Sequence, residues 1–294
     1  MRSGRIPASE FGKHMPDWLK KTICPGKSRH VKELLEKYEL NTVCASAACP
    51  NRNECYSEGT ATFMVLGNTC TRDCAFCNMA SGEPEAPYSD EADRVAAAAR
   101  DMELQYCVIT SVTRDDLPDG GSGMFAACIR GVHDIAGCRV EVLTPDFQGR
   151  EEDISAVIEA GPDVYNHNLE TVESLYSLVR PQASYARSLR LLDQVNRAGL
   201  IAKSGIMVGV GETDEEIYRL FEDLLTVGGR LLTIGQYLRP NRHCLAVREY
   251  ITPDHFSILK SKALEMGFAA VSAGPFVRSS HNARELFAEA EHAI

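Results

Sequence analysis

The sequence predicts an α/β protein with a parallel sheet, arranged as a partial (β/α)6 barrel of the TIM type. From Thr62 onward, short apolar segments typical of strands alternate six times with segments of helical periodicity. Such alternation indicates parallel strands connected by helices. The 294 residues suffice for one large core, and no internal repeat or linker divides the chain. A doubly wound open sheet has the same alternation, and periodicity does not exclude it.

The predicted elements follow one another regularly. Strands are expected at residues 62–66, 106–112, 139–143, 163–169, 203–208 and 231–237. Helices are expected near residues 31–39, 90–103, 122–136, 151–160, 171–179, 186–198, 213–227 and 254–266. Asp90, Thr213 and Pro253 stand where helices begin, and Gly199 where one ends. We expect a barrel over residues 60–268, flanked by extensions over residues 1–59 and 269–294.

The charge distribution limits the classes of partner. The net charge of −10 argues against nucleic acid, which binds basic surfaces. Residues 1–32 are an exception, because eight Lys or Arg against two acidic residues give a local charge of +6. This basic arm is either a solvated tail or a docking surface for an acidic carrier domain.

The sequence also bears on cellular location. No apolar run reaches the 18 residues of a membrane-spanning helix, and the first residues lack the apolar core of a secretion signal. Abundant free cysteines favour a reducing compartment. We therefore expect a cytoplasmic protein, with a processed organellar protein as the alternative.

Six of the eleven cysteines lie within one short stretch and form two triplets. Cys70, Cys74 and Cys77 have the spacing C-x3-C-x2-C. Three thiolates can bind three irons of a cubic iron–sulfur cluster and leave the fourth open to a small molecule. A disulfide framework is typical of short secreted chains, and structural zinc usually has four ligands in paired C-x2-C units. The spacing therefore favours a cluster with an open iron.

The second triplet and several further stretches carry a family resemblance. Cys44, Cys49 and Cys55 have the spacing C-x4-C-x5-C. With the first triplet they resemble the radical S-adenosylmethionine (SAM) superfamily and, within it, the lipoyl synthase family. Other matching stretches extend the resemblance over nearly the whole chain: Trp18-Leu19-Lys20, Cys49-Pro50-Asn51, Gly59–Met64, Arg114-Asp115-Asp116, Asn166–Val172, Gly235–Leu238 and Gly274–Ser280.

The resemblance implies two [4Fe–4S] clusters and SAM as cofactors. Cys70, Cys74 and Cys77 would hold the cluster that binds SAM. The second triplet would hold an auxiliary cluster, with a serine of Arg278-Ser279-Ser280 as fourth ligand, and the alignment favours Ser280. Residues 205–212 resemble the superfamily stretch G-x-I-x-G-x-x-E. The expected SAM contacts, with turn and cap roles as the alternative, are Ser111, Thr113, Arg114, Asn168, Glu170, Gly205, Gly209 and Glu212.

The implied reaction is the insertion of two sulfur atoms, at carbons 6 and 8, into an octanoyl chain on a carrier-protein lysine. The implied partners are an octanoylated lipoyl domain or glycine-cleavage H-type protein and an electron donor such as flavodoxin or ferredoxin. Alternatives are another radical SAM sulfurtransferase, of biotin synthase or methylthiotransferase type, and a non-catalytic iron–sulfur carrier. The chain departs from the family pattern at Ala45-Ser46-Ala47, Tyr56, Asn68, Asn78-Met79 and His281.

The remaining cysteines and two histidines have simpler interpretations. Cys24, Cys107, Cys128, Cys138 and Cys244 have no ligand spacing, and Cys107 lies in an apolar strand where packing is expected. Phe76, between two cluster ligands, either shields the cluster or is a core residue. His167 and His281 are expected to be hydrogen-bonded polar residues rather than ligands.

Overall fold

The computed structural model describes residues 4–11, 14–21 and 28–291. Its centre is an eight-stranded sheet with the order β12-β10-β9-β8-β7-β6-β3-β2. The strand bounds are β2 Asn41–Thr42, β3 Thr62–Val65, β6 Tyr106–Ser111, β7 Arg139–Leu143, β8 Val164–Asn166, β9 Ile201–Val208, β10 Leu231–Gln236 and β12 Ala270–Gly274. Two small sheets pair β1 Arg5–Pro7 with β11 Glu249–Ile251, and β4 Thr69–Cys70 with β5 Ala80–Ser81.

The strand order confirms the predicted open barrel. Seven strands from β3 to β12 run parallel and lie side by side in chain order, whereas β2 pairs antiparallel with β3. A doubly wound sheet reverses its order at a switch point, and this sheet does not. The two edge strands, β2 and β12, do not pair within the described residues, so the barrel stays open.

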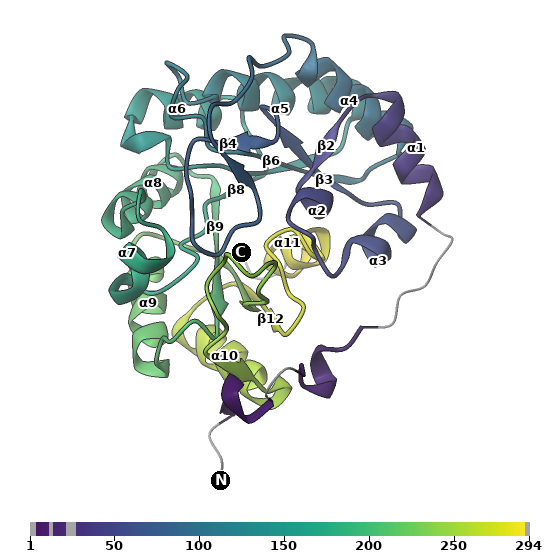
Figure 1. The fold of residues 1–294 in the computed structure, drawn as a ribbon. Coiled ribbons are helices and arrows are strands. Elements are labelled where there is room, and N and C mark those ends of the chain that lie inside the picture. Colours follow the sequence, from purple (N-terminus) through teal and green to yellow (C-terminus); the bar gives the residue numbers. More distant parts are fainter. Residues whose placement is uncertain (1–3, 12–13, 22–27, 292–294) are drawn as a thin grey trace.

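Helices cover the outer side of the curved sheet, as Figure 1 shows. In chain order they are α4 Glu91–Asp101, α5 Ser122–Ala136, α6 Glu151–Glu159, α7 Tyr176–Val179, α8 Tyr185–Arg197, α9 Asp214–Thr226 and α10 Pro253–Met266. The start signals at Thr213 and Pro253 are confirmed, since Thr213 forms a capping box with Glu216 and Pro253 occupies the first turn of α10.

Three expectations for single elements need correction. The strand expected over 163–169 ends at Asn166; beyond it only Glu170, with a positive φ of 68°, pairs with β9, through an isolated bridge to Ile206. The helix expected over 171–179 is a 3-10 turn, Glu173–Leu175, followed by α7, and it stops at Arg180, whose φ and ψ of −135° and 67° are not helical. The parallel strand β12 was not predicted, because its sequence AVSAG is short and rich in small residues.

The inner face of the sheet carries a buried polar network that the sequence analysis did not predict. Lys203 and Glu141 are both 0% exposed, and the ammonium donates to the two carboxylate oxygens at 2.7 and 2.9 Å. The Tyr106 hydroxyl and the Asn166 amide also donate to Glu141, at 2.8 and 3.1 Å. These additional hydrogen bonds offset the cost of removing the ion pair from water.

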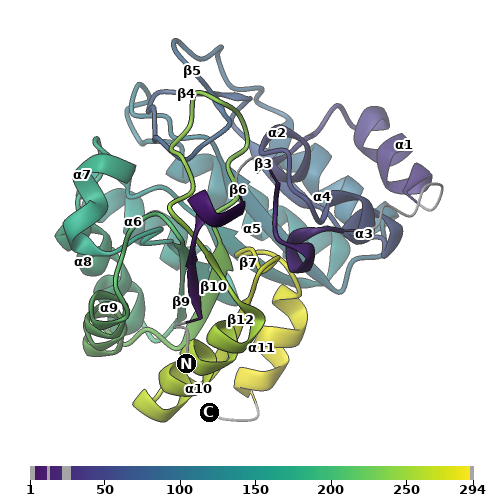
Figure 2. The ribbon, with the colours of Figure 1, turned by 60° about the horizontal axis from the view of Figure 1, so that its bottom comes forward.

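The open side of the barrel is closed by short helices and by the N-terminal arm. Helices α2 Val43–Ser46, α3 Arg52–Ser57 and α11 Ala283–Glu291 lie there, and α1 Arg29–Lys37 packs outside them on α3 and α4. The arm, dark purple in Figure 2, crosses in front of the sheet. It is fixed by the pairing of β1 with β11, by the Trp18 indole hydrogen bond to the Ile251 carbonyl (3.2 Å) and by Arg5.

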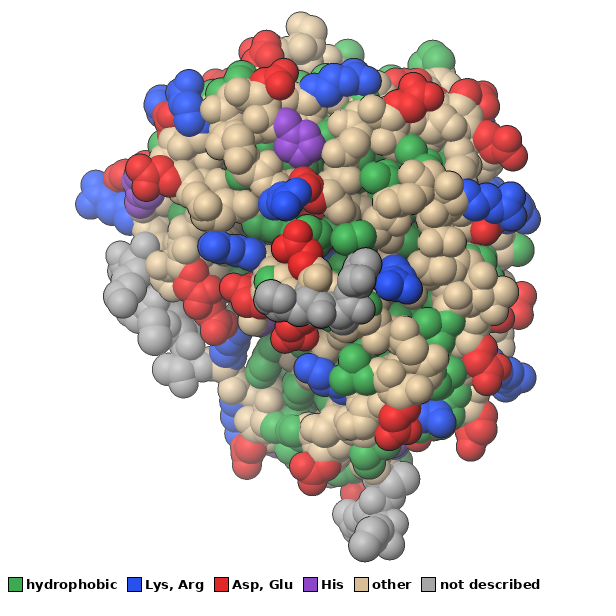
Figure 3. Space-filling model, turned by 180° about the vertical axis from the view of Figure 1, so that it is seen from behind, with side chains coloured by type: hydrophobic (Ala, Val, Ile, Leu, Met, Phe, Trp, Pro, Cys, Tyr) green, Lys and Arg blue, Asp and Glu red, His purple; other side chains and the backbone are tan. Residues whose placement is uncertain are grey.

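Charged side chains of the basic arm are largely paired within the molecule. Arg5 forms ion pairs with Glu212, Asp214 and Glu249 at 2.7–3.1 Å. Lys21 pairs with Glu54. Arg2, Lys13 and Lys27 lie outside the described residues. On the face seen from behind in Figure 3, acidic and basic side chains are interspersed.

Candidate functional site

The first cysteine triplet lies in the loop that leaves β3, at the carboxyl end of the sheet where barrel enzymes place their active groups. Backbone N–H groups of Arg72 and Thr113 point at the Cys70 sulfur, at 3.4 and 3.3 Å. The Met79 N–H points at the Cys77 sulfur at 3.4 Å. Burial raises the pKa of Cys77 to about 12. Hydrogen bonds of this kind tune iron-bound sulfur.

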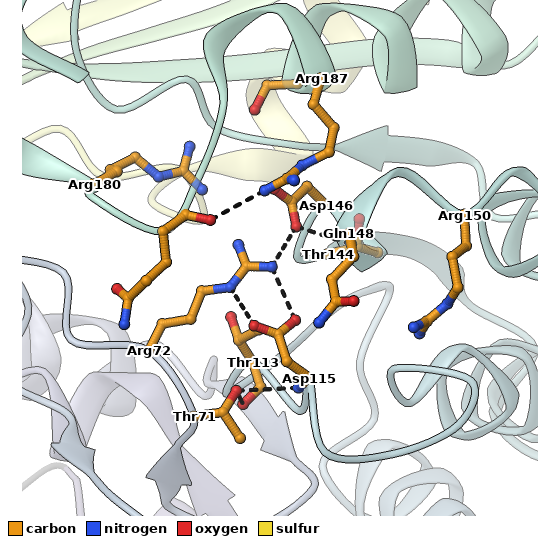
Figure 4. Close-up of polar contacts among 12 residues, drawn as sticks. Thr71, Arg72, Thr113, Asp115, Thr144, Asp146, Gln148, Arg150, Arg180 and Arg187 are labelled. Atoms are coloured by element: carbon orange, nitrogen blue, oxygen red, sulfur yellow. Dashed lines mark hydrogen bonds and ion pairs between the residues drawn. The ribbon is translucent and has the colours of Figure 1, made fainter. Parts of the chain in front are cut away.

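Arg72, between two of these cysteines, holds the loop in place (Figure 4). Its guanidinium donates to Asp115 at 2.6 and 2.9 Å and to Asp146 at 2.6 Å. Arg187 on α8 donates to the other oxygen of Asp146 at 2.8 Å. Burial opposes ionisation of Asp146, but the hydrogen bond and charge of Arg72 hold its pKa below the usual range. The triplet is thereby tied to the loops that follow β6 and β7.

A second loop, residues 238–248, covers the triplet from the side of β10. The Leu245 N–H donates to the Ala75 carbonyl at 2.8 Å, and the Cys244 thiol donates to the Cys77 carbonyl at 3.3 Å. Phe76 lines the cavity described below and packs against the hydrophobic cluster of Val179, Val210 and Tyr237. Its ring thus belongs both to the wall of the site and to a small core.

The second triplet is gathered by α2, α3 and the turn between them. Cys44 is buried on α2, Cys49 follows it in the turn, and Cys55 lies on α3. Burial, followed by the charges of Cys44 and Cys49, raises the pKa of Cys55 to about 12. The three cysteines also line one cavity, which is described below.

The two triplets differ from a site for a single metal ion. Within residues 4–11, 14–21 and 28–291, no three His, Cys, Asp or Glu side chains converge on one ion. A cubic cluster needs a wider arrangement, because each thiolate binds a different iron.

The segment Arg278-Ser279-Ser280 follows β12 and enters the same region. The Ser279 hydroxyl lies 2.6 Å from the amide nitrogen and 2.9 Å from the amide oxygen of Asn168. The Ser280 hydroxyl has no hydrogen-bond partner among the described residues and lines the cavity. Burial lowers the pKa of Arg278, whereas the charges of Cys49 and Glu170 raise it. Arg278, Cys49 and Glu170 all line the same cavity.

One cavity of about 950 Å³ joins these parts. Its wall includes Cys77 of the first triplet and all three cysteines of the second. Apolar residues from several elements also contribute: Met15, Val43, Leu104, Val108, Leu143 and Ile206. A single space thus connects both cysteine sites with an apolar wall. Such a space suits a long alkyl group.

The residues expected to contact SAM divide into two groups. Asn168, Glu170 and Gly205 line the cavity. A side chain at Gly205 would lie 2.5 Å from the Thr233 hydroxyl and 2.8 Å from Asn168, so the backbone is tightly enclosed there. Burial raises the pKa of Glu170, opposed by Arg180 and by the hydrogen bond from Asn168. Asn168 and Glu170 thus form a polar wall just after β8, beside the backbone of Gly205 within β9.

The other five expected contacts lie outside the cavity wall. Arg114 binds Asp116 at 2.8 Å twice and the Leu66 carbonyl at 3.1 Å. Glu212 accepts from the N–H groups of residues 209–211 at 2.7–3.1 Å, which shapes the loop after β9. Gly209 belongs to that loop. Ser111 is the last residue of β6 and Thr113 follows it, and the Ser111 hydroxyl is buried without a partner among the described residues. Their contacts with SAM stay predictions.

Other cysteine and histidine expectations can be compared with the structure. Cys107 is 0% exposed within the core, as expected. His167 is hydrogen-bonded through both ring nitrogens, to the Thr144 carbonyl and Ser188 at 2.9 Å each, so its expected role is confirmed. His281 lines the cavity. Cys24 lies outside the described residues.

Sequence reasoning missed several residues that organise the site. Arg72 and Arg180 are both buried, and Arg180 donates to the Asn168 carbonyl at 2.7 Å. Asn51 is 1% exposed and lines the cavity beside the second triplet. A signal existed for Asn51, which belongs to the matching stretch Cys49-Pro50-Asn51. Cys244 gave no signal, because its contact with the cluster loop depends on the fold.

Fold and cysteine loop together define a radical SAM protein. The profile of the Radical SAM superfamily matches residues 64–224. The fold is similar to that of HydG, a maturase of the [FeFe]-hydrogenase, with a TM-score of 0.57 and 14% identity, covering 90% of this chain and 67% of that chain. It is also similar to methylornithine synthase (PylB), with a TM-score of 0.54 and 14% identity, covering 83% of this chain and 74% of that chain.

Closer relatives identify the family within this class. A lipoyl synthase of Rubrobacter xylanophilus is 50% identical over 281 residues, covering 94% of this chain and 88% of its own. Those of Caldanaerobacter subterraneus and Thiobacillus denitrificans are 49% and 46% identical, covering 91% and 98% of this chain and 95% and 96% of their own. The chain belongs to the lipoyl synthase family and is a radical SAM enzyme. No helix among the described residues is long and apolar enough to cross a membrane.

Proposed function

We propose that this enzyme inserts two sulfur atoms, at carbons 6 and 8, into an octanoyl chain amide-linked to a lysine of a carrier protein. The observation that carries the proposal is the single cavity that reaches both cysteine triplets and has an apolar wall. An alkyl chain in this cavity lies between a site that activates C–H bonds and a site that holds sulfur. The names and identities of the relatives support the same reaction.

The residues present fit two [4Fe–4S] clusters and SAM. Cys70, Cys74 and Cys77 would hold one cluster, and Cys44, Cys49, Cys55 and Ser280 the other. When bound and reduced, the first cluster would supply one carbon radical from each SAM, and each radical would remove one hydrogen atom, so the two positions would consume two SAM. The protein's own groups bind and orient the cofactors and the substrate, and they exclude water. Asn168, Glu170 and Gly205 are proposed to face SAM, with Ser111, Thr113, Arg114, Gly209 and Glu212 supporting the strand ends around it.

Exclusion of water is the clearest task of the surrounding loops. Phe76 and Leu238 line the cavity wall beside the first triplet, and the 238–248 loop bonds to the cluster loop. A reactive alkyl intermediate needs such shielding, because the solvent and the protein surface otherwise react with it. The octanoyl-lysine side chain of the carrier protein is proposed to enter this cavity. A flavodoxin or ferredoxin is the proposed electron donor.

The test is a reaction of the iron-loaded enzyme with SAM, dithionite and an octanoyl-lysine peptide. We expect lipoyl-lysine peptide and two 5′-deoxyadenosine per lipoyl group. Deoxyadenosine without any sulfur insertion would leave the radical SAM class intact and refute the proposed substrate. A non-catalytic carrier would form neither product. Dethiobiotin offered in place of the peptide separates the biotin-synthase alternative.

The basic arm is proposed to attract an acidic carrier domain, and Lys20 is its testable member. The Lys20 side chain is 65% exposed and pairs only with the exposed Asp17 among the described residues, whereas Lys21 is engaged with Glu54 and Asn51. Lys20→Glu should lower kcat/KM on the octanoylated carrier several-fold, by about 1 kcal/mol at low salt. The short octanoyl-lysine peptide should react as before.

A matched control for this charge reversal is Lys260→Glu on α10. Raising the salt concentration should reduce the Lys20 effect, because the attraction is screened. Equal losses on carrier and peptide would show that the arm does not dock the carrier.

A further inference from the structure

Asn51 connects three segments that are far apart in the sequence. Its amide nitrogen donates to the Phe276 carbonyl at 2.7 Å, and its amide oxygen accepts from the Lys21 ammonium at 2.7 Å. The same ammonium pairs with Glu54 and lies 5.1 Å from the centre of the Phe276 ring. The arm, the loop of the second triplet and the segment after β12 therefore meet at one buried amide.

The segment after β12 is held at a second point three residues later. There the Ser279 hydroxyl contacts the Asn168 amide at 2.6 and 2.9 Å. Between the two points the backbone passes so close to Gly235 that a side chain there would lie 2.2 Å from the Val277 carbonyl oxygen. Residues 276–279 are thus fixed from both sides, and Ser280 comes directly after them.

We propose that Asn51 is a positioning residue for the auxiliary cluster. Its side chain sets the distance between the second cysteine triplet and the serine segment. The inference rests on the proposed function, since it assumes that both segments ligate one cluster. Asn51 lies between Cys49 and Cys55 in the sequence. Its amide nitrogen donates to the carbonyl of Phe276, which lies four residues before Ser280. One amide therefore couples the three-cysteine side of the site to its fourth ligand.

The chemistry explains why an amide suits this position. An asparagine can donate to a carbonyl and accept from an ammonium at the same time, and an aspartate can only accept. Asn51→Asp keeps the size and the contact with Lys21 but loses the hydrogen bond to Phe276. The serine segment then loses one of its two fixed points, while Cys44, Cys49 and Cys55 stay in place.

The experiment compares Asn51→Asp, Asn51→Gln and the control Asn53→Asp in iron-loaded enzyme. Asn53→Asp adds the same charge to the same helix, and the Asn53 side chain has no hydrogen bond with the described residues. Loss of iron to a chelator is followed without SAM or substrate, and oxidised samples are examined by EPR for a three-iron signal. We expect Asn51→Asp to lose one iron about tenfold faster than wild type, as the loss of one hydrogen bond allows.

Two further readouts separate positioning from general stability. Asn51→Asp should retain the SAM-binding cluster, form 5′-deoxyadenosine at the wild-type rate and melt within a few degrees of wild type. Asn51→Gln, which keeps the donor, should restore slow iron loss in part. Iron loss by Asn51→Asp at the wild-type rate would overturn the inference, and so would equal loss from both clusters. Failure of the two-cluster proposal is distinguishable from failure of the Asn51 inference, because the wild-type enzyme itself would then bind a single cluster.

Discussion

Simultaneous replacement of Cys70, Cys74 and Cys77 by alanine is expected to remove about half of the iron and all reductive cleavage of SAM. The three sulfurs share one loop, which is tied by Arg72 to Asp115 and Asp146, and we propose that they serve one cluster. The open iron of that cluster is the proposed binding point of SAM. Iron content, EPR of the reduced enzyme and 5′-deoxyadenosine formation measure the effect.

The matching triple replacement of Cys44, Cys49 and Cys55 should separate the cleavage of SAM from the formation of lipoyl product. It too should remove about half of the iron, but cleavage of SAM should continue while no lipoyl product forms. Cys128→Ala is the control, because Cys128 is buried on α5, away from both triplets in the sequence and outside the cavity wall. A triple variant that bound no iron, or retained all of it, would contradict two independent clusters.

The repeating part of the fold could be predicted because parallel strands and their helices are local patterns. Val140 and Val142 on β7, for example, are buried in the core, as an apolar strand segment indicates. The same pattern did not reveal what lies on the other face, where Glu141 is buried with Lys203. Charged residues in a strand normally indicate exposure. Only the curvature of the sheet, which brings β7 and β9 together inside the barrel, makes their pairing possible.

The site was predictable where its residues are close in sequence and less so where the fold unites them. Spacing indicated a cluster at the first triplet, and the family resemblance indicated an auxiliary cluster at the second; both ligand sets stay predictions. The strand-end residue Asn168 was expected to face SAM, yet its amide also holds Ser279, which is 111 residues away. Arg114 was also expected to contact SAM; its guanidinium is paired with Asp116, and its contact with SAM stays a prediction. A strand-end position brings a side chain near the site, but neighbouring loops decide which way it is turned.

The two serines of the segment Arg278-Ser279-Ser280 differ in the structure in a way that bears on the fourth ligand. Ser279 is hydrogen-bonded to Asn168, whereas Ser280 lines the cavity without a partner among the described residues. We propose Ser280 as the ligand of the open auxiliary iron. A serine oxygen is a harder donor than a thiolate and binds the iron of a sulfide cluster less well. A weak fourth ligand would suit the proposed reaction, in which the auxiliary cluster gives up its sulfur.

Ser280→Cys is expected to keep the auxiliary cluster assembled and to hold its labile iron more tightly. Formation of 5′-deoxyadenosine should persist, but the rate of lipoyl formation should fall about tenfold or more, equivalent to at least about 1.4 kcal/mol in the barrier. Ser280→Ala should assemble a cluster that loses one iron spontaneously. Both variants are measured by iron content, by Mössbauer spectroscopy of the auxiliary site and by product formation on the octanoyl-lysine peptide.

The same substitutions at Ser279 are the internal comparison. Ser279→Ala removes the contact with Asn168, which is the other fixed point of the serine segment, at about 1 kcal/mol for one hydrogen bond. One iron should therefore be lost somewhat faster than in wild type but more slowly than in Ser280→Ala, and lipoyl formation should fall only a few-fold. Wild-type activity of Ser280→Cys, or a stronger effect at Ser279 than at Ser280, would move the assignment to Ser279. In that case the Ser279 hydroxyl would exchange its Asn168 partner for iron when the cluster binds, and Asn168→Ala should then speed up, not slow, assembly of the auxiliary cluster.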